Sequence, residues 1–248
     1  MSPYYADDLV TLYHGDFREM LPALGRYDAI VTDPPYGETS LDWDRWPDGW
    51  PSLLTHTASS MWCFGSMRMF LDRRDEFADW KLSQDVVWEK HNGSGFHADR
   101  FRRVHEHALH WYRGDWSEVR HDPQVTNDAT ARTVRSKRRP AHTGHIDRTP
   151  YVSQDGGPRL MTSVMYAPSM YGTAINPTEK PVAIVEPLIA YAVARGGIVL
   201  DPFAGSGSTG VAARNLGVRS VLIEAREEQC EATARRLAEA PLDLGALA

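Results

Sequence analysis

Cysteine is scarce in this sequence. Its 248 residues include two cysteines, Cys63 and Cys230, which lie far apart and show no paired spacing. This scarcity excludes a disulfide framework and a zinc site built on cysteine, and it favours the reducing cytoplasm as the location of the protein. The ten histidines show no spacing typical of metal ligands either, so we predict no metal site.

Long apolar runs and a secretion signal are also missing. No apolar run exceeds about ten residues, whereas a membrane-spanning helix needs about twenty. The first residues, Met1-Ser2-Pro3-Tyr4, lack the basic start and the apolar stretch of a signal peptide. We therefore expect neither a membrane span nor secretion.

The chain has no excess of basic residues. Lys and Arg number 27 against 33 for Asp and Glu, which gives a net charge of −6. Such a total does not indicate nucleic-acid binding, but the charges are unevenly distributed. A short stretch in which Asp147 is the single acid holds Arg132, Arg135, Lys137, Arg138, Arg139 and Arg148, and a smaller basic cluster upstream holds Arg100, Arg102 and Arg103. A basic zone on an acidic body is compatible with one side that faces DNA.

The apolar pattern alternates between strands and helices. Strands are expected at 10–14, 27–32, 60–64, 85–89, 107–112, 198–200 and 220–223, and helices at 18–24, 67–80, 181–194, 208–216 and 227–239. This alternation predicts an α/β fold with a mostly parallel central sheet covered on both faces. The rhythm breaks between about 114 and 177, so we expect one domain built from 1–114 and 166–248 with an insertion at 115–165. A loop of that length is usually functional or a small subdomain.

A glycine-rich turn follows the strand expected at 198–200. Gly205, Gly207 and Gly210 match the pattern Gly-x-Gly-x-x-Gly, in which the backbone can approach a ligand closely at a helix N-terminus. Glu224 ends the next strand, where an acid would bind ribose hydroxyls. NAD binding is the common interpretation of this pattern, and a turn without a ligand is the plain one. Asp201 places a carboxylate at the strand end that could pair with an amino-acid ammonium, which favours S-adenosylmethionine.

A second motif, Asp33-Pro34-Pro35-Tyr36, follows the strand expected at 27–32. It should lie at the carboxyl end of the sheet, where α/β proteins bind ligands. The prolines fix the backbone and leave carbonyls free to accept hydrogen bonds. A carboxylate and a proline carbonyl can hold both hydrogens of an exocyclic amino group, and Tyr36 offers a face on which a base can stack, worth about 1–3 kcal/mol. The plain alternative is a proline-rich turn with an exposed tyrosine.

Together these motifs resemble those of the DNA amino-methyltransferases, which modify the amino group of adenine or cytosine. The catalytic tetrapeptide comes first and the glycine turn last, an order similar to that of the permuted beta group. Further segments that resemble family elements are His14-Gly15-Asp16, Trp88-Glu89-Lys90, His105-Glu106-His107 and the stretch from Asn176 to Pro181. The resemblance covers nearly all of the chain outside 115–165, and it implies a Rossmann-like methyltransferase fold that uses S-adenosylmethionine.

The resemblance also implies roles for individual residues. The catalytic residues would be Asp33, Pro34, Pro35 and Tyr36, and the residues around the cofactor would be Asp16, Asp33, Thr178, Lys180, Asp201, Phe203, Ala204, Gly205, Ser206, Gly207 and Glu224. Asp16 is expected near the cofactor adenine, Glu224 on the ribose, and Thr178 and Lys180 at the methionine end. Contacts to DNA are expected from Arg132, Arg135, Lys137, Arg138 and Arg139, the alternative being a solvated loop.

The implied reaction is a direct displacement on a base that has flipped out of duplex DNA. An Asp at the start of the tetrapeptide is associated mainly with adenine N6 and a Ser with cytosine N4, so Asp33 favours adenine. Cys63 lacks the Pro-Cys setting of carbon-5 methyltransferases, and we interpret it as a core residue. Trp43, Asp44 and Trp46 would either close over the base or pack in the core.

Several alternatives stay open. They are a cytosine-N4 DNA methyltransferase, an amino-methyltransferase of RNA or protein, a DNA-binding module without catalysis, and a NAD-dependent oxidoreductase. The implied partner is double-stranded DNA, and a cognate restriction endonuclease and a second copy of the chain are further partners that the resemblance suggests.

Overall fold

The computed structural model describes residues 2–94, 98–134, 151–170, 172 and 174–239. The chain divides into two compact units, one formed by Met1–Asp122 with Ser163–Ala248 and the other by Pro123–Thr162. None of the helices in the described ranges has the length and apolarity that crossing a membrane requires.

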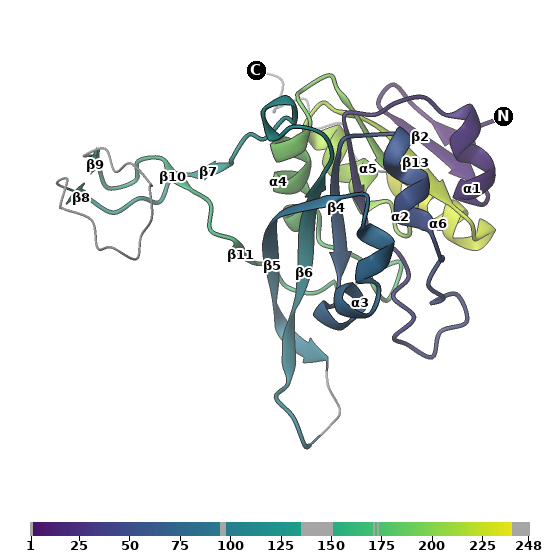
Figure 1. The fold of residues 1–248 in the computed structure, drawn as a ribbon, viewed down its shortest axis with the longest axis horizontal. Coiled ribbons are helices and arrows are strands. Elements are labelled where there is room, and N and C mark those ends of the chain that lie inside the picture. The colour runs from purple at the N-terminus through teal and green to yellow at the C-terminus, as the bar shows by residue number, and fades with distance from the viewer. Residues whose placement is uncertain (1, 95–97, 135–150, 171, 173, 240–248) are drawn as a thin grey trace. The chain divides into compact units, whose positions relative to one another are not determined.

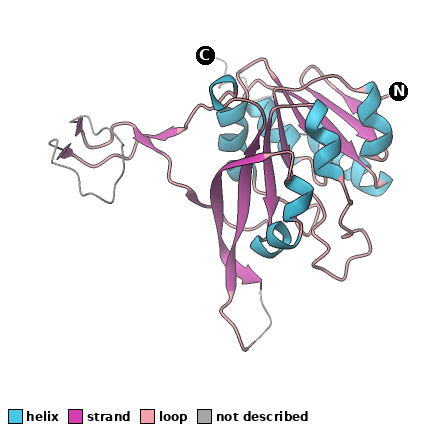
Figure 2. Cartoon of the chain, in the orientation of Figure 1, coloured by secondary structure: helices cyan, strands magenta, loops and turns pink. Residues whose placement is uncertain are grey.

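The larger unit is built around one sheet (Figures 1 and 2). Its strands are β1 (Tyr5–Ala6), β2 (Val10–His14), β3 (Ala29–Thr32), β4 (Ser60–Gly65), β5 (Lys81–Ser94), β6 (Arg103–Tyr112), β11 (Val164–Tyr166), β12 (Ile198–Asp201) and β13 (Arg219–Glu224). Its helices are α1 (Phe17–Met20), α2 (Trp50–Leu53), α3 (Met67–Asp72), α4 (Val182–Ala192), α5 (Ser208–Asn215) and α6 (Glu227–Glu239). Short 3-10 turns lie at Leu21–Ala23, Leu54–His56, Arg74–Phe77 and Trp116–Glu118.

The sheet has nine strands in the order β1-β2-β13-β12-β3-β4-β6-β5-β11. The neighbours from β2 to β4 all pair in parallel, and β11 pairs in parallel with β5. The antiparallel pairs are β1 with β2 and β6 with both β4 and β5. The predicted α/β class with a mostly parallel sheet is confirmed.

Both faces of the central strands are buried, and their side chains alternate between two cores. On β4, Met61 and Cys63 pack with Phe70, Phe77 and other residues of α2, α3 and the turns that follow them. Trp62 and Phe64 pack on the opposite face with residues of α4 and α5. Because successive side chains of a strand point to opposite faces, this division places a layer of helices on each side of the sheet.

The carboxyl ends of four adjacent parallel strands meet at one edge of the sheet. β2, β13, β12 and β3 are neighbours in that order, and each leads into a carboxylate within two residues of its end or ends on one. These residues are Asp16 after β2, Glu224 at the end of β13, Asp201 at the end of β12 and Asp33 after β3. The fold therefore gathers the predicted acids at one edge.

The helix expected at 67–80 is wrong in its length. The helix α3 begins after Ser66, whose side chain accepts a hydrogen bond from the backbone N–H of Met69, and it ends before Arg73. Arg73 leaves the helical region with φ −110° and ψ 13°, and a 3-10 turn then carries Phe77 into the same core as Phe70. The apolar spacing continued past a break in the backbone that it could not reveal.

The smaller unit consists of short strands. β7 (Val125–Thr126) pairs with β10 (Arg159–Leu160), and β8 (Arg132–Val134) pairs with β9 (Tyr151–Ser153), both antiparallel. Of the basic residues expected to contact DNA, Arg132 lies exposed on β8. Arg135, Lys137, Arg138 and Arg139 lie outside the described residues.

Candidate active site

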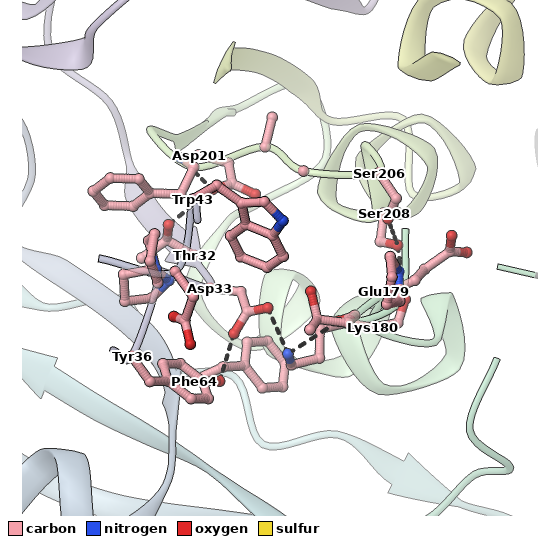
Figure 3. Close-up of a pocket in the computed structure, with 18 of the residues that line it drawn as sticks. Thr32, Asp33, Tyr36, Trp43, Phe64, Glu179, Lys180, Asp201, Ser206 and Ser208 are labelled. Carbon is pink, nitrogen blue, oxygen red and sulfur yellow. Dashed lines mark hydrogen bonds and ion pairs between the residues drawn. The ribbon is translucent and has the colours of Figure 1, made fainter. Parts of the chain in front are cut away.

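A cavity of about 990 Å³ lies at the strand-end edge of the larger unit (Figure 3). Its walls include almost all of the residues that the sequence singled out for catalysis and cofactor binding. They are Asp16, Asp33, Pro34, Pro35, Tyr36, Thr178, Lys180, Asp201, Phe203, Ala204, Gly205, Ser206 and Glu224. Gly207 is the exception, since it lies just behind the wall at the start of α5.

The glycine turn has the backbone that its sequence demands. Gly205 and Gly207 have φ angles of +49° and +75°, which side chains larger than hydrogen rarely tolerate. A Cβ atom on Gly207 would lie 2.5 Å from Cγ2 of Thr233 on α6. The N–H of Gly205 donates to Oε2 of Glu224 at 2.9 Å, so the turn is joined directly to the end of β13.

Glu224 is buried, and its carboxylate is held from two sides. Besides the Gly205 N–H on Oε2, Oε1 accepts hydrogen bonds from the backbone N–H and from Nε of Arg226, both at 3.0 Å. The Arg226 guanidinium in turn stacks on the ring of Trp43 at 4.7 Å. One acceptor position on Oε2 remains, and pairing of Glu224 with a ribose hydroxyl stays a prediction.

Asp201 is 3% exposed and receives hydrogen bonds from neutral donors. Oδ1 accepts from the Thr32 hydroxyl at 2.8 Å and from the Phe203 N–H at 3.1 Å, and Oδ2 accepts from the Thr209 hydroxyl at 2.6 Å. Burial raises the pKa of this carboxyl to about 6, against the opposing effect of these donors. One acceptor position on Oδ2 remains, and pairing with a ligand ammonium stays a prediction.

Asp16 and Thr178 lie in more open parts of the wall. Asp16 caps the start of α1, where Oδ1 accepts from the Arg18 N–H at 2.8 Å, and it pairs with the Arg18 guanidinium at 3.1 Å. Thr178 is exposed, and its hydroxyl donates to Oδ1 of Asn176 at 3.3 Å.

Both oxygens of the Asp33 carboxylate are hydrogen-bonded inside the cavity (Figure 3). Oδ1 accepts from the Tyr36 hydroxyl at 2.5 Å, and Oδ2 accepts from Nζ of Lys180 at 2.5 Å. Among the described residues, none donates a hydrogen bond to the carbonyl of Pro34. An amino group that approached Asp33 would therefore meet a carboxylate with spare lone pairs and a free carbonyl beside it.

Charged groups alternate in sign behind Asp33. Nζ of Lys180 lies 3.4 Å from Oε2 of Glu106 on β6, and Oε1 of Glu106 lies 2.5 Å from Nζ of Lys90 on β5. Burial opposes ionisation of Glu106, but Lys180 and Lys90 outweigh it and lower the pKa to about 2. The sequence motifs around Lys90 and Glu106 were noticed without a role, and Lys180 was assigned only to the methionine end.

The residues after the catalytic loop have separate positions. Trp43 lines the cavity beside Arg226, whereas Trp46 is buried in the core against Trp50. Asp44 accepts hydrogen bonds from three successive backbone N–H groups, at 37 to 39, and so fixes the loop. Core packing of Trp46 is confirmed.

Cys63 lies at 0% exposure in the core beneath this site, as expected of a core residue. Burial, with Asp33 and Asp201 nearby, raises the pKa of its thiol well above the usual range, which disfavours the thiolate form that a nucleophilic cysteine needs. Within the described ranges, no group of three or more His, Cys, Asp or Glu side chains could hold a metal ion.

Comparison with known proteins identifies the family to which this chain is similar. The DNA methylase family N6_N4_Mtase matches residues 27–235 of the chain. Type II methyltransferase M.ScaI of Streptomyces caespitosus is 28% identical over 95% of this chain and 84% of its own length. Type II methyltransferase M2.DpnII of Streptococcus pneumoniae is 24% identical over 95% and 92% of the two chains.

Solved structures show the same fold. The complex of M1.HpyAVI with S-adenosylmethionine is 21% identical and covers 92% of this chain and 100% of its own, with a TM-score of 0.63. PvuII DNA methyltransferase, described as cytosine-N4-specific, is 14% identical and covers 99% and 91% of the two chains, with a TM-score of 0.64. The chain belongs to the N6/N4 DNA methylase family, so the predicted family and methyltransferase fold are confirmed.

The family uses S-adenosylmethionine, and the cavity fits that cofactor. Asp16, Glu224 and Asp201 place carboxylates after three adjacent strands, which suits a cationic ligand that carries ribose hydroxyls. The glycine turn admits close approach of a ligand to the backbone, and the Phe203 ring supplies an apolar wall. The predicted cofactor is confirmed by the family.

Proposed function

We propose that this protein transfers a methyl group from S-adenosylmethionine to the N6 amino group of adenine in duplex DNA. The observation that carries the proposal is the position of Asp33. It lies at the end of β3 beside the free carbonyl of Pro34 and lines the same cavity as the glycine turn. The amino acceptor and the methyl donor would therefore meet within one cavity.

The cofactor supplies an electrophilic methyl group on its sulfonium. On the protein side, the Asp33 carboxylate and the Pro34 carbonyl accept the two amino hydrogens of the base and turn the nitrogen lone pair towards that methyl group. When bound, the cofactor would give up this methyl group with the electrons of the broken bond left on sulfur, while Asp33 and Pro34 hold the amino nitrogen that forms the new N–C bond. The nitrogen then loses one proton, for which the Asp33 carboxylate is the adjacent base.

The depth of the site supports base flipping as part of this proposal. The Asp33 side chain is 24% exposed, inside the cavity, and a base stacked in a duplex cannot reach it. Extruding the base costs a few kcal/mol, and stacking on the Tyr36 ring, worth about 1–3 kcal/mol, would offset part of this cost. The choice of adenine rests on Asp33 as the first residue of the tetrapeptide. Cytosine N4 is the alternative, since it carries the same kind of amino group.

A methyl-transfer assay with labelled S-adenosylmethionine tests the class of substrate. Duplex DNA, RNA and a protein mixture are offered side by side, and we expect label in duplex DNA. Label confined to RNA or protein would overturn the proposal. Absence of label from all three, with cofactor binding intact, would support a DNA-binding module without catalysis.

We propose that two basic clusters of the sequence contact the DNA. Arg100, Phe101 and Arg103 line the cavity and are exposed, and the Phe101 side chain is fully accessible. We assign the target-recognition role to the 115–165 segment, which includes the whole of the smaller unit, and to its residues Arg132, Arg135, Lys137, Arg138 and Arg139. Their positive charge in an otherwise acidic chain supports phosphate contacts from both clusters.

Replacing these five basic residues by Gln tests that assignment. We expect weaker duplex binding and a shallower dependence of affinity on salt, because fewer counterions are released on binding. Affinity for S-adenosylmethionine should stay the same. Duplex affinity equal to that of the wild type would contradict the assignment. A cognate endonuclease, a homodimer and a cytoplasmic location remain expectations.

A further inference from the structure

Lys180 occupies an unusual place for a cofactor contact. Its side chain is 6% exposed, and its ammonium lies 5.7 Å from the centre of the Tyr36 ring and 5.5 Å from that of the Phe64 ring (Figure 3). The Ser208 hydroxyl at the start of α5 donates to the Lys180 carbonyl at 2.7 Å, which anchors the backbone. The anchored backbone therefore holds the ammonium in a position where it points at Asp33.

We propose that Lys180 is a positioning residue that acts on the catalytic loop. Its ammonium holds the Asp33 carboxylate ionised and oriented, and Glu106 keeps Lys180 in place. This inference rests on the proposed function, because it assigns Lys180 to the transfer step and not only to the wall of the cofactor cavity. The ion pair with Oδ2 and the Tyr36 hydroxyl on Oδ1 fix the carboxylate at both oxygens. The lone pairs that remain are then held in one orientation.

Glu106 gives the buried ammonium a second anion. Its Oε2 atom is fully buried and accepts no hydrogen bond from the residues that the structure describes, so its partner is the Lys180 charge 3.4 Å away. Lys90 neutralises the other oxygen at 2.5 Å and lies over the Trp88 ring at 4.3 Å. Two cations and two anions alternate, so the network as a whole carries no net charge.

Several groups face Asp33, and their charges give Lys180 its importance. Tyr36 from the same loop, Cys63 from β4, Glu106 from β6, Lys90 from β5, Asp201 from β12 and Lys180 all act on it. Burial is the largest effect and, together with Glu106, raises the pKa of Asp33 above its usual value, although Lys180 and the Tyr36 hydroxyl act to lower it and so limit that rise. Without Lys180, the buried Asp33 carboxylate would face the carboxylates of Glu106 and Asp201. Lys90 pairs with Glu106 and not with Asp33 itself.

The pH profile of methyl transfer tests the proposal. In Lys180→Met the pKa of Asp33 should rise, so we expect kcat to fall most at low pH and the acidic limb to move up by about one unit or more, which is tenfold in ionised fraction. Lys180→Arg keeps the positive charge, so the acidic limb of its pH profile should lie between those of Lys180→Met and the wild type. The Kd for S-adenosylmethionine, measured by calorimetry, should change far less than kcat.

Glu106→Gln gives a shift of opposite sign. Removing this anion takes a like charge away from Asp33, so the acidic limb should move to lower pH.

Lys81→Met is the matched control for Lys180→Met, because Lys81 is on the same strand as Lys90 but contacts the carbonyl of Gly114 outside the site. We expect its profile to follow the wild type.

NMR of the Asp33 carboxyl carbon gives a readout that needs no substrate. The protein is labelled with ¹³C-aspartate, and the signal is assigned by its loss in Asp33→Asn. This signal should titrate at higher pH in Lys180→Met than in the wild type. Equal titration in both proteins, or a kcat loss in Lys180→Met that is the same at every pH, would overturn the inference. A wild-type protein that methylates no DNA would instead overturn the proposed function, and the NMR titration would still test the ion pair.

Discussion

Asp33 follows β3 and Asp201 ends the neighbouring strand β12, yet the two carboxylates have different partners. Asp201 is held by two hydroxyls and one backbone N–H, all neutral, whereas Asp33 has an ammonium at 2.5 Å. Asp201 therefore carries uncompensated charge, which is why burial raises its pKa to about 6. A carboxylate without a counter-ion suits a cationic ligand, and a carboxylate with one suits a neutral amino group.

The largest expected effect is that of Asp33→Ala. We expect methylation to fall by a factor on the order of 10²–10⁴, the usual contribution of a positioned acid or base, while cofactor affinity is retained. Initial rates and calorimetry on the same preparation measure the two quantities. Unchanged methylation would remove Asp33 from the mechanism.

Asp201→Asn should show the reverse pattern. Loss of a charged partner is expected to weaken S-adenosylmethionine binding roughly ten- to hundredfold. The folded-state pKa lies above the unfolded value, so the ionised group destabilises the ligand-free protein increasingly as pH rises from about 4 to 6. The variant should therefore be about 1–3 kcal/mol more stable than the wild type at pH 7. Unchanged cofactor affinity would assign Asp201 to structure alone.

Cofactor affinity should depend on pH through the same group. Below about pH 6, Asp201 gains a proton and loses the charge that we expect to pair with the ligand ammonium, so affinity should fall about tenfold per pH unit. Calorimetry between pH 5 and 8, in buffers of different ionisation enthalpy, should show proton release on binding near pH 6. A flat profile in the wild type, as flat as that of Asp201→Asn, would contradict this expectation.

The last prediction concerns stability and not activity, and it addresses the glycine turn. Gly207→Ala combines a φ of +75° with a contact of 2.5 Å to Thr233, whereas Gly49→Ala has the same φ of +75° and nothing within 4 Å. Both should lose about 1–2 kcal/mol to backbone strain, and Gly207→Ala a further 1–3 kcal/mol to overpacking. Denaturant unfolding of the two variants separates these contributions, and equal losses would show that Thr233 gives way.

The arrangement of acids at the sheet edge could be predicted from the sequence. Strand and helix periods set the parallel sheet, and parallel strands bring their carboxyl ends to one edge, so Asp33, Asp201 and Glu224 were expected together. The helix at 227–239 was expected with the observed bounds, Glu227–Glu239, because its charged face alternates regularly with buried positions. Local patterns suffice wherever the tertiary arrangement follows from the order of elements.

The partners of those acids could not be predicted in the same way. Lys180 and Asp33 are 147 positions apart, and nothing in either local motif says that they touch. Lys90 and Glu106 become neighbours only through the antiparallel pairing of β5 with β6. The short strands of the smaller unit were also missed, because segments of two or three residues show no period.

We propose that Asp33 directs methylation to adenine. The most direct test is to methylate duplex DNA with the wild-type protein, digest it to nucleosides and identify the modified base by mass spectrometry. We expect N6-methyladenine in DNA treated with the wild-type protein and none in DNA treated with Asp33→Ala. N4-methylcytosine as the product would contradict this proposal.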